Sequence, residues 1–127
     1  MSKATVSVLR VGIAPYDEIK KRTLAIARGK YKPSAHEPKV WFSSIESLAQ
    51  VLSSKNKLLL EIIAKEKPSS MTELAELSGR QKSNLSRTLK TLERYGIVKL
   101  EPQEGSRVRP SVVFNHFEVG FDLRMRA

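Results

Sequence analysis

The chain has 127 residues, 40% of them hydrophobic, and its 23 Lys and Arg residues against 13 Asp and Glu give a formal net charge of +10 at pH 7. This length suits one domain, or a domain with an appended arm, and the basic excess favours a polyanionic partner. Because cysteine is absent, disulfides and thiolate sites are excluded, and because no segment is typical of a membrane span or a signal peptide, we expect a cytoplasmic protein without a membrane partner.

The positive charge is concentrated towards the two ends of the sequence. Residues 1–40 carry nine basic and three acidic side chains, and residues 80–127 carry ten and five, whereas residues 41–79 carry four and five. The near-neutral middle segment is therefore predicted to be scaffold, and the positive charge falls on the first and last segments.

Residues 1–40 are predicted to form an N-terminal arm and linker. The alternating, β-branched sequence of residues 5–11 is typical of a strand, and Pro15 suits the first turn of a helix that we place over Tyr16–Arg28. Because this helix has only a narrow apolar stripe, the strand and helix must be buried against the rest of the chain or a second copy. The lysines of the helix are interpreted as solvated, with phosphate contacts as the alternative. Residues 29–38, with two prolines and no periodicity, are predicted to be the linker.

Residues 39–67 are predicted to be a short strand followed by two scaffold helices. Trp41 and Phe42 are interpreted as anchors of the arm onto the core, with stacking on a nucleic-acid base as the alternative. A serine before each helix suits an N-cap, and Pro68 follows the end of the second helix. The first helix is strongly apolar, so we expect it to be well buried, and the second is expected to turn these residues inwards: Leu58, Leu59, Ile62 and Ile63.

The segment Ser70–Gly96 has the pattern of two helices joined by a tight turn. Ser70 and Glu73 have the spacing of a capping box, and Gly79 stands where a C-cap residue with φ > 0 is needed. A second helix begins near Ser83, and its leucines recur at the spacing of one apolar face: Leu85, Leu89 and Leu92.

The opposite face of this second helix is basic and polar. It carries the following residues, with Asn84 and Thr91 on its flank: Ser83, Arg87, Lys90 and Arg94. Glu93 is the only acid between Arg80 and Arg94, whereas a merely solvated helix normally mixes both signs. A short helix, a glycine-containing turn and a basic second helix are typical of a helix-turn-helix, whose second helix enters the DNA major groove. The alternative is an αα-hairpin with a solvated basic face.

A β-hairpin is predicted directly after this helix. Residues 97–100 and 107–114 favour strands, and residues 101–106 favour a turn. A hairpin in this position is the wing of a winged helix-turn-helix domain. Residues 117–123 then alternate as a half-buried strand, whose partner is the N-terminal strand or the wing, in the same subunit or a dimer mate, and a basic tail with Arg124 and Arg126 follows.

The same segments also resemble a known family. The stretch ELAELSGRQKSNLSRTLKTLERYGIVKLE resembles the core of winged helix regulators of the MarR and ArsR type, through the Ala75–Gly79 spacing, the opening Ser83–Arg87 and the exit at Leu92…Gly96-Ile97-Val98. With HEPKVWFSSIESLAQVLS before it, this core is similar to a family of small prokaryotic predicted transcriptional regulators that carry an N-terminal strand-and-helix extension, some of them encoded beside small toxins. The resemblance implies a mainly α fold with a small antiparallel β wing (α+β), in which residues 41–127 form a winged helix-turn-helix domain with a C-terminal strand.

The expected function is sequence-specific binding to double-stranded DNA by a transcriptional regulator, acting as a repressor. Phosphate contacts are expected from Thr72, Lys82 and Lys90. Base contacts are expected from residues whose side chains can pair with base edges: Arg80, Gln81, Ser83, Asn84 and Arg87. Thr91, on the flank of the same helix, is included among the DNA-binding residues. Arg107 and Arg109 are expected to enter the minor groove or contact the backbone. A single winged helix reads only a few base pairs, so a homodimer on a two-fold related site is predicted.

Other functions are considered beside this one. The main alternative, which the family resemblance suggests, is an antitoxin that neutralises a partner toxin and regulates its own operon; a winged helix that binds RNA or only protein is another. The sequence has no Gly-rich phosphate loop, no paired catalytic residues and no metal constellation, so we expect no enzymatic activity and no cofactor, and we interpret His36 and His116 as ordinary polar residues. Nothing in the sequence indicates a small-molecule effector pocket.

Overall fold

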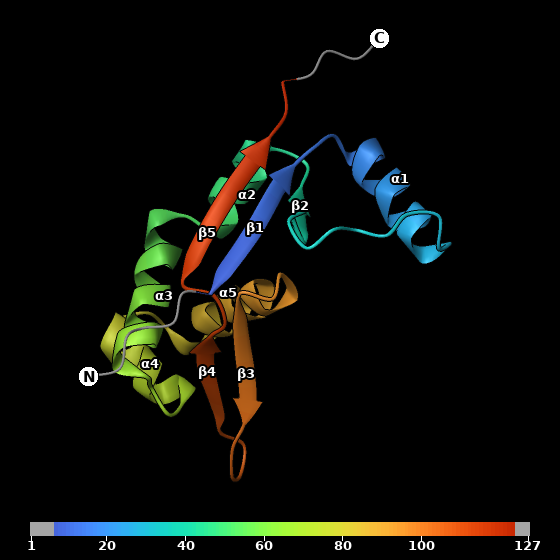
Figure 1. Cartoon of the computed structure of the whole chain (residues 1–127). Coiled ribbons are helices and arrows are strands. Elements are labelled where there is room, and N and C mark those ends of the chain that lie inside the picture. Colours follow the sequence, from blue (N-terminus) through green and yellow to red (C-terminus); the bar gives the residue numbers. More distant parts are fainter. Residues whose placement is uncertain (1–6, 124–127) are drawn as a thin grey trace, which may run out of the picture. The chain divides into compact units, whose positions relative to one another are not determined.

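The computed structural model describes residues 7–123, which form five helices and five strands (Figure 1). In chain order these are β1 (Val8–Ile13), α1 (Tyr16–Ala27), β2 (Val40–Phe42), α2 (Ile45–Val51), α3 (Ser54–Glu66), α4 (Met71–Ser78), α5 (Lys82–Arg94), β3 (Val98–Pro102), β4 (Val108–Val112) and β5 (His116–Phe121). The predicted α+β class is confirmed. None of these helices has the length and apolar character needed to cross a membrane. The first two residues of the predicted N-terminal strand and the tail with Arg124 and Arg126 lie outside the described residues.

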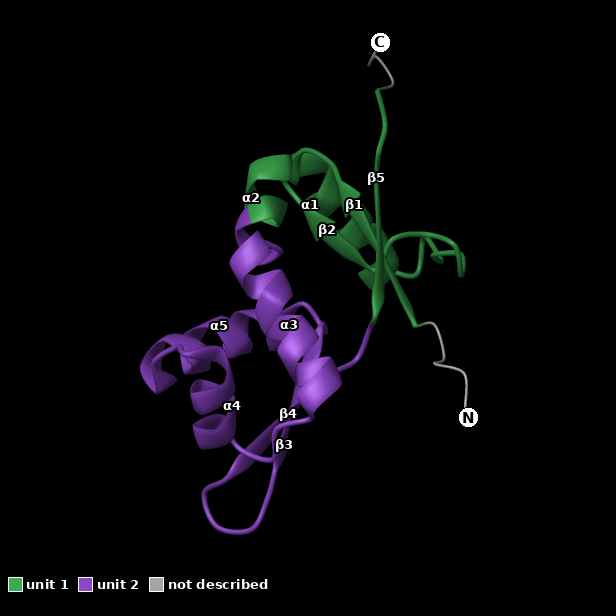
Figure 2. Ribbon diagram, turned by 90° about the vertical axis from the view of Figure 1, so that its left-hand side faces the viewer, with its two compact units in different colours: residues 1–49, 115–127 green, residues 50–114 purple. Residues whose placement is uncertain are grey.

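The chain divides into two compact units (Figure 2). Unit 1 consists of residues 1–49 and 115–127, and unit 2 consists of residues 50–114. This division differs from the predicted one, which placed a boundary after residue 40 and put the C-terminal strand in the second domain. The reason is strand pairing, because β5 pairs with β1 along its whole length and therefore belongs with the N-terminal segment.

Unit 1 is built on a parallel three-stranded sheet of order β2-β1-β5. β1 pairs with β5 from Val8↔His116 to Ile13↔Phe121, and its second half pairs with β2. The prediction that the C-terminal strand pairs with the N-terminal strand is confirmed within one chain, and pairing with the hairpin is wrong. The buried core of this unit contains Leu9, Val11, Phe42 and Leu48.

Several apolar side chains of unit 1 are exposed, contrary to expectation. α1 has no buried residue, although a buried apolar stripe was predicted. In α2 only Leu48 is buried and Ile45 is exposed, so the prediction of a well-buried helix is wrong. On β5 both Val119 and Phe121 are exposed, so the predicted half-buried apolar face is wrong for the isolated chain. The physical reason is that, within residues 7–123, no segment covers these side chains closely enough to bury them.

Unit 2 packs three helices against a two-stranded antiparallel hairpin. Ser53 caps α3 by accepting the backbone N–H of Asn56 at 3.2 Å. Leu60 replaces the predicted Leu58 on the buried face of α3, and Leu58 is exposed. β3 and β4 pair from Val98↔Val112 to Pro102↔Val108, so residues 101 and 102, predicted to be turn, extend the first strand. The side chains at the centre of this core are Leu59, Ile63, Leu74, Leu85, Leu89, Leu92, Ile97 and Val98.

Candidate nucleic-acid interface

The turn between α4 and α5 is fixed by local caps. The Ser70 hydroxyl oxygen accepts the backbone N–H of Glu73 at 3.1 Å, and Gly79 has a φ of +70°, so both predicted caps are confirmed. The reciprocal half of the predicted capping box is wrong, because the Glu73 carboxylate accepts the hydroxyl of Ser69 at 2.7 Å and its N–H at 3.1 Å. These two hydrogen bonds lower the pKa of Glu73. Thr72 lies exposed in the same first turn of α4.

α5 separates an apolar face from a basic one, as its sequence predicted. It begins at Lys82, one residue before the predicted start, with Gln81 as the N-cap residue. Its buried leucines are each 0% exposed: Leu85, Leu89 and Leu92. The half-buried Thr91 donates its hydroxyl to the carbonyl of Arg87 at 3.2 Å. The remaining predicted site residues of this helix have exposed side chains: Lys82, Ser83, Asn84, Arg87 and Lys90.

Arg80 is held by three side-chain acceptors. Its guanidinium donates to Oδ1 of Asn56 at 3.3 Å, to Oδ1 of Asn84 at 2.7 Å and to the hydroxyl oxygen of Thr88 at 3.0 Å. Its Nε is buried and has no hydrogen-bond partner among the residues that the structure describes. Because Asn56 lies on α3 and the other two acceptors lie on α5, Arg80 links the two helices. This geometry suits a positioning residue better than one that reads a base.

The two arginines of the hairpin differ in their surroundings. Arg109 lies opposite Glu101 in the ladder, and its Nη2 lies 2.9 Å from Oε2 of that carboxylate. This contact, together with the attraction of the guanidinium charge, lowers the pKa of Glu101. Arg107 is exposed at the end of the loop that turns through Gly105, whose φ is +70°. The charge of Arg109 is therefore partly neutralised by Glu101. The exposed guanidinium of Arg107 does not share that carboxylate.

Every predicted site residue belongs to unit 2. All of them are exposed except Arg80 and Thr91, which are partly buried. Sequence reasoning missed Asn56 and Thr88, which have no place in the helix-turn-helix pattern. Their hydrogen bonds with Arg80 depend on the packing of α3 beside the turn, so no local sequence pattern predicts them.

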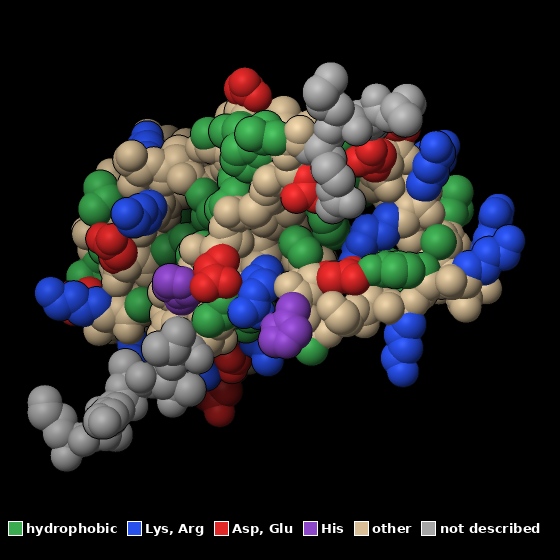
Figure 3. Space-filling model, turned by 45° about the horizontal axis from the view of Figure 1, so that its top comes forward, with side chains coloured by type: hydrophobic (Ala, Val, Ile, Leu, Met, Phe, Trp, Pro, Cys, Tyr) green, Lys and Arg blue, Asp and Glu red, His purple; other side chains and the backbone are tan. Residues whose placement is uncertain are grey.

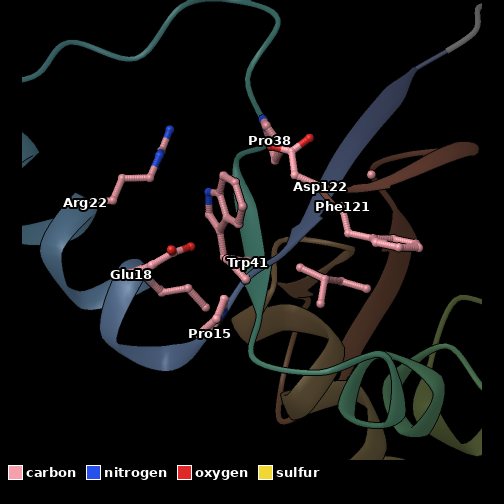
Figure 4. Close-up of a pocket in the computed structure, with 11 residues that line it drawn as sticks. Pro15, Glu18, Arg22, Pro38, Trp41, Phe121 and Asp122 are labelled. Carbon is pink, nitrogen blue, oxygen red and sulfur yellow. The ribbon is translucent and has the colours of Figure 1, made fainter. Parts of the chain in front are cut away.

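Unit 1 contains a hollow of about 820 Å³ that the sequence did not indicate (Figure 4). Trp41 of β2 faces Arg22 of α1, whose guanidinium carbon lies 5.1 Å from the centre of the ring. Arg22 also forms an ion pair with Glu37 at 2.7 Å. The hydroxyl of Tyr31 donates to the same carboxylate, which lowers the pKa of Glu37 and raises that of Tyr31. The charged residues that line the hollow are one cation, Arg22, and two acids, Glu18 and Asp122, so it is less basic than the exposed face of α5.

The fold and the site together define an α+β protein whose helical unit exposes a basic helix beside a β-hairpin. The sequence model of the HVO_A0114 family matches residues 51–119, which is more than half of the chain and includes all of α3, α4, α5, β3 and β4. The chain belongs to the HVO_A0114 family. Comparison with curated proteins and with solved structures gave no match.

Proposed function

We propose that the protein is a winged helix-turn-helix regulator that binds double-stranded DNA in a sequence-specific manner, as a homodimer, and represses transcription. The observation that carries this proposal is the division of α5, whose leucines are fully buried while its outward face presents Lys82, Arg87 and Lys90 with one acid, Glu93, in the helix. The element order supports the same proposal, because three helices followed by an antiparallel hairpin is the order of a winged helix.

In this proposal α5 lies in the major groove with its N-terminal half towards the bases. Arg87 and Gln81 are exposed and suit guanine and adenine edges respectively. Lys82 and Lys90, with Thr72 at the start of α4, contact phosphates, which position the protein and carry little sequence information. We assign Arg80 a positioning role in place of a base contact, because its Nη1 and Nη2 donate to Asn56, Asn84 and Thr88. Arg80 holds α5 in place, and the base contacts come mainly from its neighbours.

Selection of random duplex DNA on the purified protein tests this function. The wild type is expected to enrich a palindromic motif. Arg87→Ala is expected to lose the base preference at one position of each half-site in the enriched motif, because a bidentate contact is worth about 1–3 kcal/mol of discrimination. Lys90→Ala is expected to weaken binding to all sequences and to lower the salt slope by about one.

Lys65→Ala is the matched control, because it removes an exposed lysine of α3 that the proposal does not use. This variant is expected to enrich the wild-type motif. Salt-sensitive binding without any enriched motif would mean that the contacts are non-specific and would overturn sequence-specific regulation.

A second candidate function is supported by α1. This helix has no buried residue, and Tyr16 and Leu24 are exposed on it. An amphipathic helix with a free apolar side suits docking to a partner protein. The candidate is an antitoxin whose α1 binds the toxin encoded beside it. Co-purification with the product of the adjacent gene is expected to be lost in Leu24→Lys and kept in Lys20→Ala, and failure of the wild type to co-purify would overturn this candidate.

A further inference from the structure

β5 is an edge strand of the unit 1 sheet within residues 7–123. The backbone N–H of His116 donates to the carbonyl of Ser7 at 3.1 Å, and the parallel pairing with β1 continues from there. In a parallel ladder, alternate residues direct both backbone groups to the same neighbour, so His116, Glu118 and Gly120 face β1. The residues between and after them direct their backbone groups to the open edge: Phe117, Val119 and Phe121.

The same three residues place apolar side chains on the face of the sheet that holds Leu9 and Val11, because Leu9 pairs with Phe117 and Val11 with Val119. Leu9 and Val11 are 2% and 1% exposed, whereas Val119 and Phe121 at the edge are 48% and 54% exposed. Apolar side chains reach the surface between charged ones on the face that Figure 3 shows. An open edge with exposed apolar side chains is a surface that proteins normally pair or protect with charge.

We propose that β5 pairs with β5 of a second copy of the chain, antiparallel about a two-fold axis at Val119, so that two three-stranded sheets join into one. The inference rests on the proposed function, from which it takes the homodimer. It adds the surface through which the two copies meet and the register in which their strands pair. A self-complementary strand satisfies the requirement of a two-fold interface, in which the same patch is used on both copies.

The charges of β5 exclude the neighbouring registers. The open backbone groups repeat every second residue, so a two-fold axis perpendicular to the sheet lies level with a residue of β5, and only axes at Glu118 and Val119 let more than half of each strand overlap. An axis at Glu118 places the two Glu118 carboxylates directly opposite each other. An axis at Gly120 places Glu118 opposite Asp122. Like charges in directly opposed positions destabilise an antiparallel pair, so both registers are disfavoured.

The axis at Val119 brings complementary groups together instead. Glu118 then faces Gly120 of the second copy, and each carboxylate keeps its contact with Arg10 of its own sheet at 3.2 Å. His116 faces Asp122 of the second copy, which places an imidazole donor against a carboxylate. On the other face the pairing is apolar throughout: Val119 with Val119, and Phe117 with Phe121.

Cysteine cross-linking of the full chain tests the register, because the sequence contains no cysteine of its own. In Val119→Cys the two thiols lie opposite each other in a hydrogen-bonded pair, where the Cα atoms are about 5.5 Å apart and within the range of a disulfide. Mild oxidation is expected to convert this variant to a covalent dimer. Glu118→Cys reports the competing register, and Ser106→Cys, exposed in the hairpin loop of unit 2, reports random collision. Cross-linking of Glu118→Cys at the rate of Val119→Cys, or faster, would overturn the register.

Light scattering tests the interface without any cross-link. The wild type is expected to be a dimer at micromolar concentration, and Val119→Lys is expected to be a monomer with an unchanged far-UV circular dichroism spectrum, because a lysine on an edge strand prevents pairing. A monomeric wild type, or a Val119→Lys variant that stays dimeric, would overturn the inference.

These measurements use no DNA, so they separate this inference from the proposed function. A β5-linked dimer that enriches no DNA motif leaves the inference intact and overturns sequence-specific regulation. A protein that enriches a motif while Val119→Lys remains dimeric supports the function and overturns the interface.

Discussion

The guanidinium of Arg80 donates a 2.7 Å hydrogen bond to the side-chain oxygen of Asn84. Two side chains that suit base recognition are thus occupied with each other in the free protein. Asn56 accepts a hydrogen bond from Nη1 of Arg80 and Thr88 accepts one from Nη2, so a polar network links the start of α5 to α3. The network fixes where the exposed Arg87 lies relative to the core of unit 2.

Replacing Arg80 by alanine is expected to lower the free energy of unfolding by about 1–3 kcal/mol, because three acceptors lose a charged donor. The variant is also expected to weaken DNA binding on every sequence without relaxing one base position. Arg87→Ala is the matched control, with a free energy of unfolding within about 0.5 kcal/mol of the wild type and relaxed specificity. Urea unfolding and DNA titrations measure both quantities. Unchanged stability with one relaxed base position in Arg80→Ala would show instead that Arg80 reads a base.

The two arginines of the hairpin are expected to contribute unequally to the salt dependence of DNA binding. Arg107→Ala is expected to lower the salt slope by about one, as loss of one phosphate contact does. Arg109→Ala is expected to lower it by less, because Glu101 already neutralises that guanidinium. Affinities measured over a series of salt concentrations give the slopes. Equal losses in the two variants would contradict this difference.

A side chain at Gly12 is expected to disturb unit 1, whereas one at Gly120 is not. A Cβ at Gly12 would lie 2.5 Å from the ring of Trp41, while a Cβ at Gly120, its partner in the ladder, would meet no heavy atom within 4 Å. Gly12→Ala is therefore expected to cost about 1–3 kcal/mol of stability, as overpacking does, and to shift the fluorescence of the single tryptophan. Gly120→Ala is the control. Identical fluorescence spectra for Gly12→Ala and the wild type would show that Trp41 does not pack on Gly12.

The stability of unit 2 is expected to depend on pH through Glu73. The hydroxyl and N–H of Ser69 lower the pKa of this carboxyl from its usual value of 4.5. A group with a lowered pKa in the folded state stabilises the protein above the unfolded pKa, and that contribution is lost as the pH falls through the folded pKa. The stability difference between the wild type and Glu73→Gln should therefore shrink as the pH falls below about 4.5. Urea unfolding at pH 7 and pH 3 measures it, and a difference that is the same at both would contradict the role of Glu73.

Local patterns predicted unit 2 well. The cap at Ser70, the left-handed Gly79 and the three buried leucines of α5 each depend on residues within a few positions of one another, so spacing alone predicts them. The rotation of α3 was less accurate, with Leu60 buried in place of Leu58. Consecutive apolar residues in that helix leave its inward face ambiguous until the neighbouring helices are known.

Features that join distant segments could not be predicted in the same way. The pairing of β1 with β5 joins residues more than one hundred positions apart, and the sequence predicted it only as one of two alternatives, because the alternating pattern of a strand does not say which strand is its neighbour. The pattern of β5 also implied a buried face, but Val119 and Phe121 remain exposed, because burial depends on a covering segment and none covers them among residues 7–123. The hydrogen bond from Arg80 to Asn56 could not be predicted for a similar reason, since Asn56 lies on another helix.

The pairing of β1 with β5 also has a consequence for the order in which the protein folds during synthesis. Unit 2 is a continuous stretch, residues 50–114, whereas unit 1 needs segments on both sides of it. A ribosome therefore completes unit 2 before it has made β5, and β1 stays without that neighbour until the last strand emerges. Closing so long a loop is slow, so we expect unit 1 to form after unit 2. A nascent chain that stalls before residue 115 would present a folded helical unit together with an unfinished sheet.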